Sequence, residues 1–198
     1  TKEVNIGSIK KIDDDNTGKH VSFSPNMNEI AYIHTDSLYV TSLTESKEKQ
    51  LLASGCDSFI WINENWLLYN TGKDFYWVNN TGQSTDIAFL GHNCGNVVFG
   101  NYQGTDKIIY SCDSNHNIYL AALTYDSNNK PKLGVSIGVL PEGTDGYQPA
   151  MSPSGNLIAF RNPTAGYVLI VFNLSTKNVL IPVPNQVVGD NLYWLTLE

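Results

Sequence analysis

The 198-residue chain has 12 Lys and Arg against 19 Asp and Glu, a formal charge of −7 at pH 7. No basic cluster exceeds the pair Lys10-Lys11, so we expect no nucleic-acid partner, because phosphates are bound by clustered cations. Hydrophobic residues make up 41% of the chain, which is enough for a packed core, but no apolar run approaches the roughly 18 residues that span a bilayer.

Short runs of Val, Ile, Tyr, Phe and Trp alternate with clusters of Gly, Asn, Asp, Ser and Pro along the whole chain. This pattern predicts strands and turns rather than helices. An end strand over 4–12 comes first, and another over 191–197 comes last. Between them we predict four units, each with strands a, b, c and d, over 20–57, 58–93, 94–145 and 146–190.

The predicted strands in chain order are as follows. Unit one has 20–24, 29–34, 37–43 and 49–54. Unit two has 58–62, 66–70, 74–79 and 85–90. Unit three has 96–100, 107–111, 118–124 and 132–140. Unit four has 148–152, 157–161, 167–173 and 178–183.

One phrase recurs in this series, as HVSFSPNMNEIAY over 20–32 and as QPAMSPSGNLIAF over 148–160. Every strand b also carries an aromatic residue one or two positions before its end: Tyr32, Tyr69, Tyr110 and Phe160. A four-stranded meander repeated about every 40 residues is typical of a β-propeller blade. We therefore expect an all-β fold, a β-propeller of four full four-stranded antiparallel blades, with 1–198 as a single propeller domain or segment.

The two end strands, 4–12 and 191–197, do not complete a blade of their own. They would form a partial or reduced fifth blade, or the chain is a segment of a ring with five or more blades. A third alternative is that an open sheet edge pairs with another chain, since uncovered edges are templates for pairing.

Residues 24–32 (SPNMNEIAY) and 152–160 (SPSGNLIAF) resemble the TolB-type, WD-repeat-like blade, whose usual pattern is Ser-Pro-Asp-Gly-x-x-(Ile/Leu)-Ala-(Phe/Tyr). The Asp of that pattern is Asn26 in one copy and Ser154 in the other, and units two and three lack Ser-Pro. The resemblance implies a divergent propeller rather than TolB itself. It also implies a protein partner and a periplasmic, cell-surface or secreted location in a bacterium.

Propeller geometry places the d–a loops and the b–c turns on one face of the molecule, which we call the loop face. We expect this face to contact a protein or saccharide partner, because rigid scaffolds carry function on their loops. The expected contact residues are His34, Asp36, Asp57, Lys73, His92, Asp113, His116, Tyr147 and Arg161. The Ser-Pro turns fall on the opposite face and are expected to be scaffold.

The three cysteines, Cys56, Cys94 and Cys112, cannot all be paired within one chain. If His92, Cys94, Cys112 and His116 converged, they would offer a tetrahedral zinc site. Their spacing is not that of a recognised zinc motif, and we predict no metal site. A Cys94–Cys112 disulfide and a buried Cys112 beside exposed histidines are the other two alternatives.

No G-x-S-x-G elbow and no glycine-rich phosphate loop occurs, so we expect neither an enzyme nor a cofactor. Two alternatives to a binding propeller stay open. One is the accessory propeller of a larger hydrolase, similar to those of prolyl-oligopeptidase-type peptidases. The other is a lectin-like propeller that holds a saccharide on tryptophans such as Trp61 and Trp77, although such residues also fill gaps between blades.

Overall fold

The computed structural model describes residues 18–44, 48–72, 74–82, 85–89, 94–112, 116–166, 168–180 and 192, with backbone alone over 85–89 and 94–96. Every regular element in these ranges is a β-strand. The strands form four antiparallel four-stranded sheets, each paired in chain order, which confirms the expected fold class. The end strands 4–12 and 191–197 fall outside these ranges, apart from Leu192.

Each sheet corresponds to one predicted unit. Unit one holds β1 (Gly18–Phe23), β2 (Glu29–His34), β3 (Ser37–Ser42) and β4 (Gln50–Ser54). Unit two holds β5 (Ser58–Trp61), β6 (Trp66–Asn70), β7 (Phe75–Asn79) and β8 (Thr85–Phe89). Unit three holds β9 (Cys94–Tyr102), β10 (Thr105–Cys112), β11 (Asn117–Tyr125) and β12 (Pro131–Gly138). Unit four holds β13 (Tyr147–Met151), β14 (Leu157–Asn162), β15 (Val168–Asn173) and β16 (Val179–Leu180).

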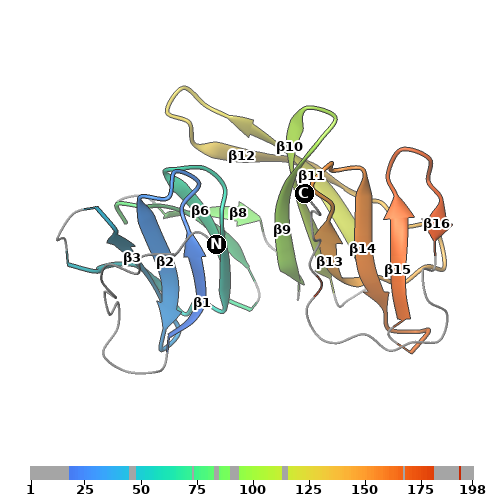
Figure 1. The fold of residues 1–198 in the computed structure, drawn as a ribbon, viewed down its shortest axis with the longest axis horizontal. Helices are drawn as coiled ribbons and strands as arrows, with labels where there is room; N and C mark the ends of the chain where they lie inside the picture. The colour runs from blue at the N-terminus through green and yellow to red at the C-terminus, as the bar shows by residue number, and fades with distance from the viewer. Residues whose placement is uncertain are drawn as a thin grey trace, which may run out of the picture.

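The sheets pack against one another in chain order around their first strands. β1 contacts β5, β5 contacts β9, and β9 contacts β13. Figure 1 shows unit one at one end of this arrangement and unit four at the other, with units two and three between them. Sheets stacked side by side around their innermost strands make the propeller arrangement.

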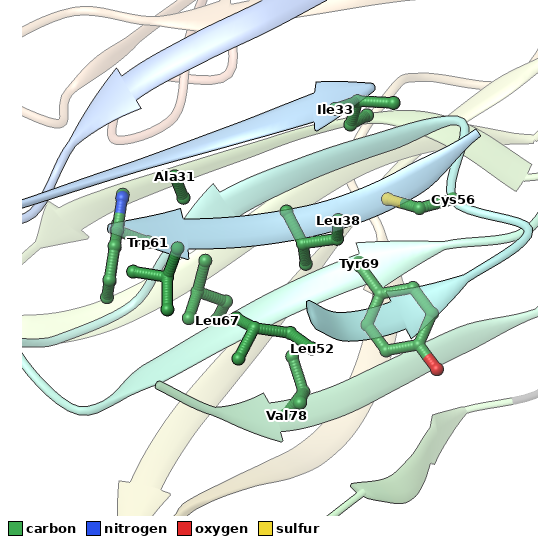
Figure 2. Packing of buried hydrophobic residues seen from close by; sticks show 10 residues of the cluster. Ala31, Ile33, Leu38, Leu52, Cys56, Trp61, Leu67, Tyr69 and Val78 are labelled. Carbon is green, nitrogen blue, oxygen red and sulfur yellow. The ribbon is translucent and has the colours of Figure 1, made fainter. Parts of the chain in front are cut away.

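The central strands bury both of their faces, and alternate residues serve different neighbours. Along β6, Leu67 and Tyr69 join the cluster between units one and two, whereas Trp66 and Leu68 join the cluster between units two and three. Figure 2 shows Leu67 and Tyr69 beside unit-one residues such as Leu38. This period of two follows from the pleat of the strand.

One apolar cluster fills each junction between consecutive units. The first contains Ala31, Ile33, Leu38, Val40, Leu52, Cys56, Trp61, Leu67, Tyr69 and Val78. The second contains Ile62, Trp66, Leu68, Phe75, Trp77, Ile108, Tyr110, Cys112 and Leu123. The third contains Ile109, Ile118, Leu120, Val139, Leu140, Ile158, Phe160, Ile170, Phe172 and Leu174. Each cluster takes side chains from two consecutive units, so the core of the described residues lies between sheets and not within one.

The recurring aromatic near the end of strand b has a structural role in three units. It stacks on a tyrosine directly across the β-ladder, at centroid distances between 5.3 and 5.8 Å. In unit four Phe160 lies opposite Ile170 instead. Aromatic pairs of this kind add about 0.5–1.5 kcal/mol each beyond their buried area. The stacked pairs are Tyr32–Tyr39, Tyr69–Tyr76 and Tyr110–Tyr119.

In units one, two and four, a polar side chain at the start of the a–b turn accepts a hydrogen bond from the backbone of the turn. The Ser24 hydroxyl accepts a hydrogen bond from the Glu29 backbone N–H at 3.0 Å, and Ser152 does the same for Leu157 at 3.1 Å. Unit two lacks Ser-Pro, but the Asn63 side-chain oxygen accepts a bond from Trp66 N–H at 2.9 Å. The repeated phrase is therefore a local turn device that another polar residue can replace.

Gly155 and Gly104 give a matched test of how unit four packs on unit three. Both have φ near +70°, but a Cβ at Gly155 would collide with the Asn101 carbonyl, while one at Gly104 would meet nothing within 4 Å. We expect Gly104→Ala to lower the free energy of unfolding by about 1–2 kcal/mol, because alanine is strained in the left-handed backbone conformation. Gly155→Ala should lower it by at least about 2 kcal/mol more, because the turn must also move away from unit three. Urea unfolding of both variants checks this, and equal losses would contradict the packing described.

Candidate binding face

The b–c turns and the d–a loops lie side by side on the loop face. In unit one the Cys56 N–H, in the d–a loop, donates to the Asp36 carbonyl in the b–c turn at 2.7 Å. In unit three the Gly146 N–H donates to the His116 carbonyl at 2.6 Å. Backbone bonds of this kind hold exposed loop residues in place on the sheets.

The b–c turn of unit one is a tight two-residue hairpin turn. Thr35 and Asp36 both have positive φ, 45° and 58°, as a primed turn between twisted strands requires. The Asp36 carboxylate points outward and forms an ion pair with Lys19 Nζ at 3.2 Å. Both side chains are about half or more exposed, 48% and 69%, so the pair contributes at most about 1 kcal/mol.

Cys56 lies directly beneath this part of the loop face and is fully buried as a free thiol. Its Sγ–H donates to the Ser58 carbonyl at 3.4 Å. Burial, followed by the nearby charge of Asp57, raises the pKa of the thiol to about 12. Cys56 is therefore part of the apolar core between units one and two, and its raised pKa keeps it in the thiol form at neutral pH.

The structure places the expected contact residues in different environments. Asp36, Asp57 and His116 are exposed, and His34 and Tyr147 are half-buried. The hydrogen bonds above bring Asp36 next to the loop that carries Asp57, and His116 next to the loop that carries Tyr147. The remaining predicted residues, Lys73, His92 and Asp113, lie outside the described ranges.

Arg161 does not fit the expectation of a contact residue. It is only 8% exposed, and its Nη1 donates to the Gln148 side-chain oxygen at 2.7 Å. β14 continues to Asn162, so Arg161 is part of the sheet and lies opposite Tyr147. The sequence pattern placed it near a loop because the strand was expected to end at 161.

Cys112 is disulfide-bonded, and the residue directly opposite it in the β9–β10 ladder is Cys94. A cysteine in a disulfide offers no thiolate to zinc. Among the described residues, no group of three or more His, Cys, Asp or Glu side chains is arranged to hold a metal ion.

A cavity of about 360 Å³ lies on the opposite face of the molecule, between units one and two. Its walls are a–b turns, such as Asn26 and Asn65, and c–d segments, such as Thr44 and Thr81. Sequence reasoning missed this cavity, because spacing along the chain does not show that turns of two different sheets enclose a space.

No family model and no curated protein sequence matches the chain. Among solved structures, TolB from Acinetobacter baumannii has a TM-score of 0.59 at 17% identity, over 84% of this chain and 43% of that one. A protein assigned as TolB from Agrobacterium tumefaciens gives 0.55 at 14% identity, over 85% and 62%. Hsv2 from Kluyveromyces lactis gives 0.60 at 13% identity, over 84% and 51%.

The chain has a TolB-like propeller fold. These similarities extend to the fold alone, because all three identities are below one fifth. The chain spans between 43% and 62% of the length of these structures. The described residues contain no helix long and apolar enough to cross a membrane.

The raised pKa of Cys56 predicts a slow reaction with iodoacetamide. At pH 8 a pKa of about 12 in place of 9.0 leaves about 1000-fold less thiolate in the folded protein than in urea. The labelling rate in urea should reach half its maximum near pH 9 and level off above about pH 10, whereas the rate of the folded protein should still rise there. Peptide mass spectrometry measures both rates.

Asp57→Asn serves as the matched variant for this measurement. It should raise the labelling rate of the folded protein only slightly, because burial is the larger cause of the shift. Equal labelling of folded and unfolded protein at pH 8 would show that Cys56 is accessible and that the loop face is not closed over it.

Proposed function

We propose that this protein is a non-enzymatic binding propeller that presents its loop face to a protein partner. The observation that carries the proposal is the pair of backbone hydrogen bonds that lock b–c turns to d–a loops, from Cys56 to Asp36 and from Gly146 to His116. They hold exposed polar side chains on rigid sheets, which lowers the entropy lost on binding. The contact residues we propose are His34, Asp36, Asp57, Lys73, His92, Asp113, His116 and Tyr147.

We further propose that the protein works in the bacterial envelope or outside the cell. The disulfide at Cys112 supports this location, because structural disulfides persist in oxidising compartments. We also propose that 1–198 forms one propeller segment, since each apolar cluster joins two consecutive units.

No described feature favours the two alternative functions over this one. Trp61 and Trp77 are 7% and 3% exposed and belong to the clusters between units. They are therefore packing residues, and the lectin-like alternative loses the aromatic surface on which it relied. The free thiol in the described part of the chain, at Cys56, is buried, so it does not support a hydrolase.

Affinity capture from an envelope extract tests the proposed face. The bait is the full chain, compared with a loop-face variant (Asp36→Asn, Asp57→Asn and His116→Ala) and with a matched variant on the opposite face (Asn128→Ala and Ser154→Ala). Loss of central contact residues should reduce recovery of a partner about tenfold or more. The matched variant should retain it.

Quantitative mass spectrometry reads out the recovered proteins, and circular dichroism confirms that both variants fold. Loss of the partner with the opposite-face variant, and not with the loop-face variant, would overturn the assignment. Unchanged recovery with both variants would do the same.

A further inference from the structure

The cavity between units one and two is a preformed space on the face opposite the loop face. It has a volume of about 360 Å³, which falls within the range of small-molecule sites. Residues of both units contribute to it. They are Asn26, Asn28, Glu29, Val40, Thr41, Ser42, Thr44, Glu48, Gln50, Glu64, Asn65, Asn80 and Thr81.

Hydrogen bonds between the two units hold the walls of this cavity together. The Asn80 side-chain amide of unit two donates to Glu29 Oε2 of unit one at 2.9 Å, and the Gln50 side-chain amide of unit one donates to the Thr81 carbonyl of unit two. Within unit two, the Asn80 backbone N–H donates to the Asn65 carbonyl at 2.9 Å. These bonds fix the walls before any ligand arrives, so little ordering is needed on binding.

Gly82 allows the two units to approach each other at this place. It has φ +67°, and a Cβ there would lie 3.2 Å from both the Gln50 amide and the Leu51 carbonyl. The c–d turn of unit two therefore rests on β4 of unit one. This contact lies beside Gln50 and Thr81, which are both lining residues of the cavity.

The lining is rich in acceptors and carries negative charge. Three carboxylates, Glu29, Glu48 and Glu64, come from three different segments, and no described lining residue is basic or aromatic. Glu29 uses Oε2 to accept from Asn80. Within the described part of the chain, Glu48 and Glu64 form no ion pair. A carboxylate has about four acceptor positions, so much of this capacity is open to a ligand.

This chemistry selects the class of ligand. An anion would be repelled, and a saccharide would find no aromatic surface to stack on. The carboxylates do not form a group that could hold a metal ion. The remaining match is an organic cation with several donors. A guanidinium is always charged and presents five N–H donors in a plane, whereas an ammonium presents three.

We propose that this cavity binds the guanidinium group of an arginine side chain presented by a protein partner. The inference rests on the proposed function only in assuming that the partner is a protein. The site is distinct from the loop face, because a–b turns and c–d segments form its walls. The carboxylates pair with the guanidinium N–H groups, and the amide and hydroxyl oxygens of the lining accept the remaining donors.

Isothermal titration of the full chain with N-acetyl-arginine amide tests the site. N-acetyl-citrulline amide is the matched ligand, since it has nearly the same shape without the charge, and it should bind at least about tenfold more weakly. Glu64→Gln should weaken arginine binding about fivefold, and Glu48→Gln with Glu64→Gln about 20-fold. Raising the salt concentration should weaken binding as well.

Glu142→Gln is the matched variant, because it removes the same charge from an exposed position on the loop face, away from the cavity. It should leave arginine affinity within about twofold. Amide NMR of the same samples should place the perturbed signals at Asn28, Asn65 and Asn80. Equal affinity for the two ligands, no binding of the arginine probe at about 20 mM (roughly 20 times a Kd of about 1 mM), or equal loss with Glu142→Gln would overturn the proposal.

The two proposals fail separately. The titration uses no protein partner and no loop-face residue other than Glu142. If the capture experiment fails and arginine still binds selectively, the cavity is a site and the loop face is not. If arginine does not bind and capture depends on Asp36, Asp57 and His116, the loop face stands and the cavity proposal is wrong.

Discussion

The need to bury both faces of every sheet is the constraint on which the rest of this structure depends. A single four-stranded meander cannot enclose an apolar core, and here each cluster forms only where two sheets meet. Adjacent residues on one strand, such as Leu67 and Leu68, therefore stabilise different junctions. These junctions hold the sheets in chain order. The b–c turns and d–a loops then lie at one end of the strands, and the a–b turns and c–d segments lie at the other end.

The two ends of the strands have different structural tasks. On the loop face, backbone bonds tie turns to loops, and exposed side chains are held on a fixed support. On the opposite face, the turns must fit against the neighbouring unit. Gly155 packs on the backbone of Asn101, whereas Met27, at the same place in the repeated phrase, is 60% exposed. The residues that the two phrases share form the turn itself. The position at which Met27 and Gly155 differ is set by whether a neighbouring unit packs against the turn.

The strand pattern was predictable because alternation and turn residues are local. Most strands begin and end within two residues of the predicted positions. The a–b hairpin of unit three is longer than predicted, because Gln103 and Gly104 both take positive φ and close a tight turn. Gln is not a usual residue for that conformation, so the sequence did not indicate this turn.

The burial of Arg161 and the presence of the cavity were not predictable. Burial of an arginine and formation of a cavity between units one and two depend on how sheets meet, which spacing along the chain does not encode.

Nuclear Overhauser effects between methyl groups test the central claim most directly. In a sample with stereospecifically labelled leucine and isoleucine methyls, Leu67 should show contacts to Leu38 and Leu52 of unit one. Leu68, the next residue, should show contacts to Ile108 of unit three and none to those unit-one residues. If Leu67 and Leu68 shared the same neighbours, or contacted only their own sheet, the sheets would not be stacked as separate units with a cluster at each junction.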